Sequence, residues 1–281
     1  MRGAYYKIST MSEEARAKGL VAASAGNHAQ GVAYAAQKFG CKATIVMPTV
    51  TPLIKVNRTK SYGAEVILYG DVYDDSCAYA EKLAQERGST FVHPFDDLDI
   101  VAGQGSIAME IVQELPTVDY ILAPVGGGGL ITGVSTLAKM LNPKIKVIGV
   151  EPAAAPSMTM ALASGEPVTL DSANTIADGT AVKRVGDRIF EYAKKNIDQM
   201  LTVEDDELVG AFLDMVENHK MIVENSGLLT VAALKQLDFE RKEGGCNFKW
   251  RQHGCYHNVF HCTAWTDSER PYLFGICITS G

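Results

Sequence analysis

The stretch Val21–Gly31 reads VAASAGNHAQG, and about a hundred residues later Pro124–Gly133 reads PVGGGGLITG. In both stretches an apolar run ends in small residues and a helix-like pattern follows. A strand, a tight loop and a helix N-terminus in succession gather unpaired backbone N–H groups at the positive end of the helix dipole. The two stretches therefore predict two anion-binding loops, one for a ligand phosphate and one for a substrate carboxylate.

Four consecutive glycines, Gly126, Gly127, Gly128 and Gly129, form the centre of the second loop. Without Cβ atoms this backbone can close on a phosphate and adopt positive φ angles. The motif lacks the Lys-Ser/Thr of a P-loop and the spacing of a dinucleotide-binding GxGxxG. Taken alone, it also fits a simple tight turn from a strand into a helix.

Length and composition favour a globular enzyme of one or two domains, because 281 residues can bury a sizeable core. A net charge of −7 argues against an extended nucleic-acid surface. No apolar run reaches the roughly 18 residues that span a bilayer, and no signal peptide is recognisable at the start. Six irregularly spaced cysteines do not suggest a disulfide framework. We expect a cytoplasmic protein.

Strand-like and helix-like runs alternate along the chain, which predicts parallel sheets covered by helices. The strand-like runs are Leu20–Ser24, Ala43–Met47, Ala64–Leu68, Thr90–Val92, Tyr120–Pro124 and Lys146–Val150. Examples of the helix-like runs between them are Val72–Arg87 and Gly105–Leu115. Two amphipathic helices are expected later, over Glu204–His219 and Ser226–Leu237, with Thr202 and Asn225 as N-caps.

Five segments occur in a characteristic order: SAGNHAQG (24–31), AGQGSIAMEI (102–111), PVGGGGL (124–130), VIGVEP (147–152) and TIADGTAVKRVG (175–186). On these residues the chain resembles the threonine/serine dehydratase family of pyridoxal-phosphate enzymes, which also contains serine racemases. The resemblance extends from Arg2 to about Lys242. It implies an α/β fold of type II, similar to the β subunit of tryptophan synthase, with the cofactor between two parallel-sheet domains. The small domain would comprise residues 20–95, and an incomplete large domain would comprise 1–19 and 96–242.

The resemblance implies pyridoxal 5'-phosphate as cofactor and assigns residues to it. The cofactor phosphate would be held by Gly126, Gly127, Gly128, Gly129 and the N–H of Leu130. Asn27 would bond the ring hydroxyl, while Gly179 and Glu224 would lie beside the ring. The loop that receives the substrate carboxylate would consist of Ser24, Ala25, Gly26, Asn27 and His28. Without the resemblance, Glu224 is equally compatible with a solvated acid at a helix edge. The resemblance favours His28 as a loop-forming residue over an acid or base, because the family uses the backbone of this residue.

A lysine that holds the cofactor as an imine is required by this chemistry. In the family it lies in a Ser-Phe-Lys-x-Arg-Gly-Ala motif, whereas this chain opens Met1-Arg2-Gly3-Ala4. The lysine would immediately precede Met1, which takes the place of the motif's variable residue. Lys7 lies about two helical turns away and is not expected to substitute. No catalytic residue is therefore assigned within the chain.

No metal is expected either. Some relatives hold a cation with an acid, a backbone carbonyl and a second acid. Glu151 and the carbonyl of Ala155 would match the first two, but Ser157 stands in the place of the second acid.

The last segment, residues 243–281, differs in composition, with both tryptophans and four of the six cysteines. One interpretation is a zinc site built from His253, His257, His261, Cys255 and Cys262, although their spacing matches no CxxC framework. The favoured interpretation is a frameshifted, non-native tail, because permissive codons for this segment, read one base forward, can encode the family's Ser-Gly-Gly-Asn strand. We expect such a tail to have little regular structure.

The resemblance implies a threonine ammonia-lyase that converts L-threonine to 2-oxobutanoate and ammonia, within amino-acid metabolism and isoleucine biosynthesis. Without the lysine, this chain is expected to be inactive. The alternatives are a serine dehydratase or racemase on the same scaffold, or a truncated gene product without activity. Ala25 favours a dehydratase, because the racemase's second proton donor would be a serine there. The expected partners are an amino-acid substrate and further copies of the chain, but no nucleic acid and no membrane.

Overall fold

The structure is a computed structural model that describes residues 1–237, 249–256, 259–265 and 272–278. Of the last three ranges only the backbone is described. The chain divides into two compact units, Met1–Gly103 and Gln104–Gly281, which are described separately below.

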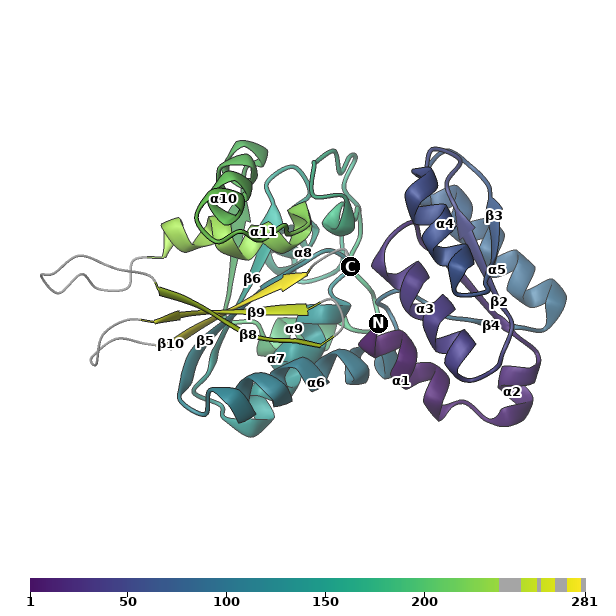
Figure 1. The fold of residues 1–281 in the computed structure, drawn as a ribbon, viewed down its shortest axis with the longest axis horizontal. Coiled ribbons are helices and arrows are strands. Elements are labelled where there is room, and N and C mark those ends of the chain that lie inside the picture. Colours follow the sequence, from purple (N-terminus) through teal and green to yellow (C-terminus); the bar gives the residue numbers. More distant parts are fainter. Residues whose placement is uncertain (238–248, 257–258, 266–271, 279–281) are drawn as a thin grey trace, which may run out of the picture. The chain divides into compact units, whose positions relative to one another are not determined.

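The first unit is built on a fully parallel sheet with the strand order β3-β2-β1-β4 (Figure 1). Its strands are β1 (Leu20–Ala23), β2 (Ala43–Met47), β3 (Glu65–Leu68) and β4 (Thr90–Phe91). Its helices are α1 (Arg2–Thr10), α2 (Glu13–Ala17), α3 (Asn27–Lys38), α4 (Leu53–Ser61) and α5 (Tyr73–Arg87).

Alternate residues of β1 enter two different hydrophobic clusters, so helices cover both faces of this sheet. Leu20 and Ala22 join a cluster with α1, α3 and α4. Val21 and Ala23 join another with Ala80, Leu83 and Ala84 of α5. This burial on both faces explains why β1 reads as a continuous apolar run rather than an alternating one.

Helix α1 packs closely within the first unit because glycines line its contacts. A Cβ on Gly31 of α3 would lie 3.1 Å from the Cα of Met1, and a Cβ on Gly3 would lie 2.7 Å from the carbonyl oxygen of Ile100. The side chain of Ile8 is fully buried in the cluster with α3. The resemblance places residues 1–19 in the large domain, and that domain assignment stays a prediction.

The second unit contains a six-stranded sheet with the order β7-β6-β5-β10-β9-β8. Strands β5, β6, β7 and β10 are parallel, and β9 is antiparallel to both of its neighbours. The strands are β5 (Val118–Pro124), β6 (Lys146–Pro152), β7 (Gln199–Val203), β8 (Lys249–Tyr256), β9 (Val259–Trp265) and β10 (Tyr272–Ile278).

Helices cover both faces of the parallel part of this sheet as well. Ile121 and Ala123 of β5 face one cluster, and Leu122 faces the other. The helices are α6 (Leu98–Glu114), which begins in the first unit, α7 (Gly129–Leu141), α8 (Ser157–Ser164), α9 (Phe190–Asn196), α10 (Asp205–Glu217) and α11 (Asn225–Ala233). Short 3₁₀ helices, η1 and η2, cover Asp178–Thr180 and Leu234–Gln236.

The alternating strands and helices predicted from the sequence are confirmed. Five of the six predicted strands differ from the observed strands by one or two residues at one end, and α6 begins at Leu98, seven residues before the predicted Gly105. The predicted N-caps are wrong. Thr202 lies inside β7, a strand that the sequence did not reveal, and α10 is instead capped by Glu204, which forms a capping box with Glu207. Asn225 is the first residue of α11, and Glu224 precedes it as the N-cap.

The segment expected to lack regular structure contains β8, β9 and β10, so that expectation differs from the structure. His257 lies outside the described residues, as do the side chains of the other residues of the suggested zinc site. The frameshift interpretation and the zinc interpretation both remain predictions. Among the residues that the structure describes, no helix is both long and apolar enough to cross a membrane.

A half-buried ion-pair cluster fixes α1 to the start of α6 and to the residue before it. Lys7 Nζ lies 2.7 Å from a carboxylate oxygen of Asp97 and 3.1 Å from one of Asp99. Burial alone would raise the pKa of Asp97, but the hydrogen bond and charge of Lys7 outweigh it and lower that pKa. The pair therefore stabilises the folded state above the ordinary pKa of an aspartate, and the contribution is lost as pH falls through the lowered value.

We predict that Asp97→Asn lowers the free energy of unfolding by about 2 kcal/mol at pH 7, because the variant leaves Lys7 partly buried without one of its charge partners. The difference from the parent chain should shrink in acid. Urea unfolding at pH 7 and pH 3 measures both effects. The matched control is Glu65→Gln, which removes the exposed partner of Arg87 and should cost less than about 1 kcal/mol. Equal losses in the two variants would contradict the prediction.

Candidate functional site

The first predicted anion-binding loop leads from the end of β1 into α3. The backbone N–H of Ser24 donates to the carbonyl of Val46 over 3.1 Å, and the Ser24 hydroxyl accepts from the N–H of Gly26, also over 3.1 Å. Gly26 is the N-cap of α3, and no side chain caps the helix there. The first-turn N–H groups of Asn27 and His28 thus lie at the positive end of the helix dipole, as a carboxylate site requires.

His28 is held by a hydrogen bond to the backbone. Its Nε2 lies 2.9 Å from the carbonyl oxygen of Val92. Because a carbonyl only accepts, Nε2 carries the proton and Nδ1 is the basic nitrogen. Burial lowers the pKa of His28 to about 4, so the imidazole is neutral at pH 7. This arrangement suits the loop-forming role expected for His28 better than a role as a charged acid.

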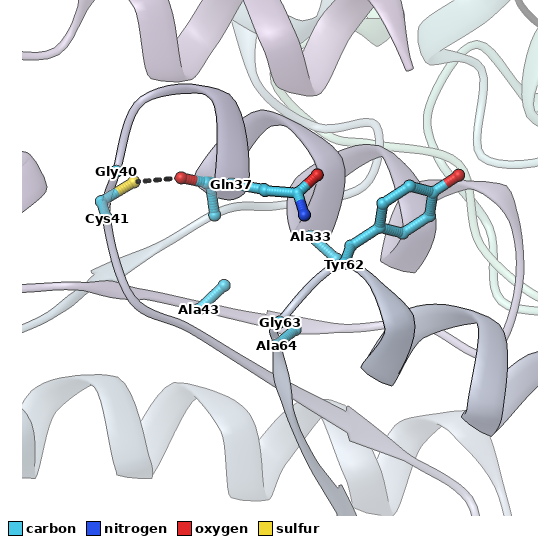
Figure 2. Close-up of a pocket in the computed structure, with 9 residues that line it drawn as sticks. Ala33, Gln37, Gly40, Cys41, Ala43, Tyr62, Gly63 and Ala64 are labelled. Carbon is cyan, nitrogen blue, oxygen red and sulfur yellow. Dashed lines mark hydrogen bonds between the residues drawn. The ribbon is translucent and has the colours of Figure 1, made fainter.

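A pocket of about 230 Å³ lies elsewhere in the first unit (Figure 2). It is lined by the start of β2 at Ala43 and by the ends of α3 and α4, at Gln37 and Tyr62. Ligands of open parallel sheets bind beyond the carboxyl ends of the strands, whereas this pocket lies at the amino end of β2. None of the predicted site residues lines it.

The second predicted loop connects β5 to α7, and two of its glycines are required by close contacts. A Cβ on Gly126 would lie 3.0 Å from the Cα of Thr180. Gly128 has a φ of +97° and a Cβ there would lie 2.8 Å from Cε of Met158. Larger residues would both strain the backbone and collide with neighbouring segments. The glycines therefore do more than form a tight turn.

The N–H groups of this loop are suited to bind an anion. Gly127, Gly128 and Gly129 are buried, and the described residues supply no acceptor for their N–H groups or for that of Leu130. Buried N–H groups almost always have a partner. The N–H groups also lie at the start of α7, where the helix dipole favours negative charge. A phosphate group would satisfy both the hydrogen bonds and the dipole.

Three segments far apart in the sequence meet beside the glycine loop. Gly126 lies against Thr180 of η1, as the Cβ distance above shows. A Cβ on Gly179 would lie 2.8 Å from the Ser226 hydroxyl and 3.9 Å from a carboxylate oxygen of Glu224. The structure thus brings the glycine loop, Gly179 and Glu224 together within the second unit. The roles assigned to these residues stay predictions.

The structure also reveals neighbours of the loop that the sequence did not indicate. The N–H of Gly186 donates to the carbonyl of Gly127 over 3.1 Å, and a Cβ on Gly128 would lie 3.0 Å from Cδ1 of Ile189. Thr180 and Ser226 approach each other at 3.4 Å through their hydroxyls. The sequence analysis assigned no site role to these residues, although Thr180 and Gly186 belong to the characteristic segment 175–186, so only the fold identifies them as neighbours of the loop.

Lys7 does not have the properties of a lysine that forms a covalent bond to a cofactor. Burial alone would lower its pKa, but hydrogen bonds and charge from Asp97 and Asp99 outweigh burial and raise the pKa above the usual value. The ammonium group is therefore fully protonated at pH 7 and paired with carboxylates, whereas a nucleophilic amine must be neutral. This agrees with the expectation that Lys7 does not replace the family lysine.

No group of three or more His, Cys, Asp or Glu side chains that could hold a metal is present among the described residues. Glu151 is fully buried at the end of β6, and its carboxylate accepts hydrogen bonds from the start of α8. Desolvation by burial raises the pKa of Glu151 to about 7, against the opposing effect of the N–H groups of Met158 and Thr159. The carboxylate is thus committed to the protein's own donors.

Comparison with known proteins identifies the family to which this chain belongs. The family described as "Pyridoxal-phosphate dependent enzyme" matches residues 1–245. The chain is 48% identical over 244 residues to the L-threonine ammonia-lyase of Thermotoga maritima. The aligned region makes up 86% of this chain and 61% of that protein. It is 43% identical over 236 residues to a biosynthetic L-threonine dehydratase of Escherichia coli, and that aligned region makes up 84% of this chain and 46% of the relative. The chain thus spans about half to three fifths of these relatives.

Solved structures agree with these matches. A processed threonine deaminase from Solanum lycopersicum superimposes with a TM-score of 0.80 at 44% identity, covering 82% of this chain and 67% of that one. A serine racemase from Dictyostelium discoideum gives a TM-score of 0.77 at 37% identity, covering 83% and 75%. Both the sequence matches and the fold of the two units therefore show that the chain belongs to the pyridoxal-phosphate dependent enzymes, in the threonine dehydratase family with fold type II.

Proposed function

We propose that the chain is the scaffold of a threonine ammonia-lyase, which converts L-threonine to 2-oxobutanoate and ammonia. The observation that carries this proposal is the glycine loop of the second unit, whose buried N–H groups at the start of α7 are suited to a phosphate. The identity of 48% to an L-threonine ammonia-lyase supports the choice of substrate. Cytoplasmic location and assembly of several copies are further expectations of this proposal.

The residues assigned in each unit have distinct proposed roles. Bound pyridoxal phosphate supplies an electron sink for negative charge at the substrate Cα. Gly127, Gly128 and Gly129 hold its phosphate through backbone N–H groups. The N-terminus of α3 binds the substrate carboxylate, with Ser24 fixing the loop through its bond to Gly26. Neutral His28 keeps the loop in place by donating to Val92.

For proton transfer at Cα, the proposal assigns no group among the residues that the structure describes. The family lysine would precede Met1, and Met1 lies against Gly31, one turn along α3 from the SAGNH loop. A residue preceding Met1 would thus lie close to that loop in the first unit. General acid–base catalysis contributes about 10²–10⁴ to a rate, so turnover is expected to require that lysine.

A serine racemase is the second candidate, because two solved serine racemases are similar in fold at 35–37% identity. Residue 25 distinguishes the two functions. Its alanine side chain cannot donate or accept a proton, which a racemase needs on the face of the cofactor opposite the lysine. A version of the chain that carries the lysine should therefore form ketoacid from L-serine without forming D-serine, and chiral chromatography of the products distinguishes the two outcomes.

The phosphate assignment predicts the effect of a charge in the loop. Gly128→Asp adds a side chain where only hydrogen fits and a negative charge beside the anion, so affinity for pyridoxal phosphate should fall by about tenfold or more. Titration of the chain with pyridoxal phosphate, followed by fluorescence, measures this. Gly165→Asp is the matched control, because Gly165 also has a positive φ, +86°, but ends α8 away from the loop. Unchanged affinity in Gly128→Asp would refute the assignment.

The charge state of Lys7 predicts its lack of reaction with the cofactor. After incubation with pyridoxal phosphate and reduction with borohydride, peptide mass spectrometry should find no pyridoxyl group on Lys7 at pH 7. Asp97→Asn, which removes one of its charge partners, is the informative comparison and should make Lys7 more reactive. A modified Lys7 in the unaltered chain at stoichiometric yield would show that this lysine can hold the cofactor.

Activity should depend on both ends of the sequence. Four versions are compared: the 281-residue chain, one extended upstream of Met1 with the family segment that ends in Ser-Phe-Lys, one read in the shifted frame from Glu243 onward, and one with both changes. Only the last supplies the lysine and the Ser-Gly-Gly-Asn strand together, so only it should release 2-oxobutanoate from L-threonine at a useful rate. Robust turnover by the unaltered chain would overturn the interpretation of both ends.

A further inference from the structure

Glu151 ends strand β6 with a carboxylate that holds the first turn of α8. Its Oε1 accepts the N–H of Met158 over 2.7 Å, and its Oε2 accepts the N–H of Thr159 over 2.9 Å. The hydroxyl of Thr159 donates to the same Oε2 over 2.8 Å. A carboxylate with no solvent exposure costs stability unless it is hydrogen-bonded, and these donors compensate for that cost. The contact fixes where α8 begins relative to β6.

The side chain of Met158 connects the start of α8 to the glycine loop. Its side chain is fully buried, and its Cε would lie 2.8 Å from a Cβ at Gly128. Ile189 supports the same glycine from another segment, at 3.0 Å from that Cβ position. The hydrogen-bonded backbone of Met158 and its packed side chain thus form one continuous path from Glu151 to Gly128.

The end of strand β6 contacts both the residue at which the glycine loop begins, Val125, and, through Glu151, the residue that packs under Gly128. The N–H of Val125, the residue before Gly126, donates to the carbonyl of Val150 over 2.8 Å. Val150 and Glu151 are consecutive, so one end of one strand sets both the start of the loop and the residue beneath Gly128. A shift of Glu151 or of the start of α8 would therefore move the loop's support relative to its entrance.

A cation does not explain this arrangement. The carboxylate oxygens of Glu151 are directed at N–H and O–H donors, which would repel a cation, and Ser157 provides no second negative charge. The cation-binding pattern of some relatives therefore does not fit this chain, and hydrogen bonds take its place.

We propose that Glu151 is a positioning residue for the phosphate-binding loop, acting through the start of α8 and the side chain of Met158 on Gly128. The proposal rests on the proposed function of that loop, namely phosphate binding, and deepens it. Glu151 does not contact the phosphate in this view. Its effect reaches the ligand only through the geometry of the loop's N–H groups.

Two variants interrupt the path at different points. Glu151→Gln keeps the size of the side chain but replaces one acceptor oxygen by an NH₂ donor, so one hydrogen bond to α8 is lost. Met158→Ala leaves the Glu151 hydrogen bonds intact and removes the contact with Gly128. The matched control is Asp198→Asn, because Asp198 is a carboxylate of the same unit that accepts the N–H of Val147 over 2.8 Å at the opposite end of β6. Asp198 also pairs with Lys139 near the far end of α7 and with Lys146, so this control shows what the loss of a hydrogen-bonded carboxylate outside the proposed path does to the loop.

Hydrogen exchange provides a readout that does not depend on any ligand. In peptides covering 125–130, the N–H of Val125, which is hydrogen-bonded to Val150, should exchange about tenfold faster in Glu151→Gln and in Met158→Ala than in the parent chain, and close to the parental rate in Asp198→Asn. A general loss of stability would accelerate exchange throughout the second unit in all three variants. Parental exchange at 125–130 in both path variants, or equal acceleration in the control, would overturn the proposal.

Binding measurements separate this proposal from the proposed function. The affinity of the path variants should fall about fivefold to tenfold for pyridoxal phosphate and stay unchanged for pyridoxal, which lacks the phosphate. An equal fall for both ligands would overturn the positioning role. If the parent chain itself binds pyridoxal phosphate no better than pyridoxal, the phosphate assignment of the loop fails, and the exchange comparison still decides whether Glu151 positions the loop.

Discussion

The absence of Cβ atoms at residues 126 and 128 is the constraint on which the second unit depends. It lets the loop after β5 lie against η1 on one side and against Met158 on the other. Because backbone rather than side chains lines this region, its chemistry consists of N–H groups, and their directions are set by neighbouring segments. Because the loop contacts these segments so closely, a displacement of either segment would also displace the loop. Closely packed protein interiors transmit such displacements.

Two basic groups of the first unit show how environment decides chemistry. Lys7 has carboxylate partners and stays charged, whereas burial outweighs the other influences on His28 and keeps it neutral. In each case the surroundings move the pKa further from 7 and so reinforce the charge state that the group would have in water at pH 7. The proposed division of labour, in which the cofactor carries charge and the protein supplies fixed dipoles, follows the general pattern of enzymes of this kind.

Local patterns in the sequence predicted much of the fold. The two loops lie where strand, small residues and helix follow one another, and β1, β2 and β6 were recognisable because burial on both faces leaves long apolar runs. Strand β7, Gln199–Val203, escaped because it mixes polar residues into a short, half-exposed run. The cap of α10 escaped because Glu204 and Glu207 act as a pair, which a search for Ser, Thr or Asn overlooks.

Single sequence motifs could not predict which residues from distant parts of the chain contact each other in the fold. The sequence pattern gives no reason for Gly179 to meet Ser226, or for Glu151 to hold α8, since both depend on how the chain crosses over the sheet. The resemblance to a family named the glycines and Glu224 as neighbours of one ligand. It did not name Met158 or Ile189, because these act through packing and any apolar residue of similar shape could occupy their positions.

Strand β5 has a second consequence beyond the loop that follows it. It lies between β6 and β10 in the sheet, so its hydrogen-bonding groups on one side are taken by a strand from the very end of the chain. A β5 deprived of that neighbour would present an open row of N–H and C=O groups, which recruits strands from other molecules. The strand that leads into the proposed anion-binding loop would thus also be the place where this fold begins to self-associate, so a loss of β10 would affect solubility at the same element that carries the proposed ligand loop.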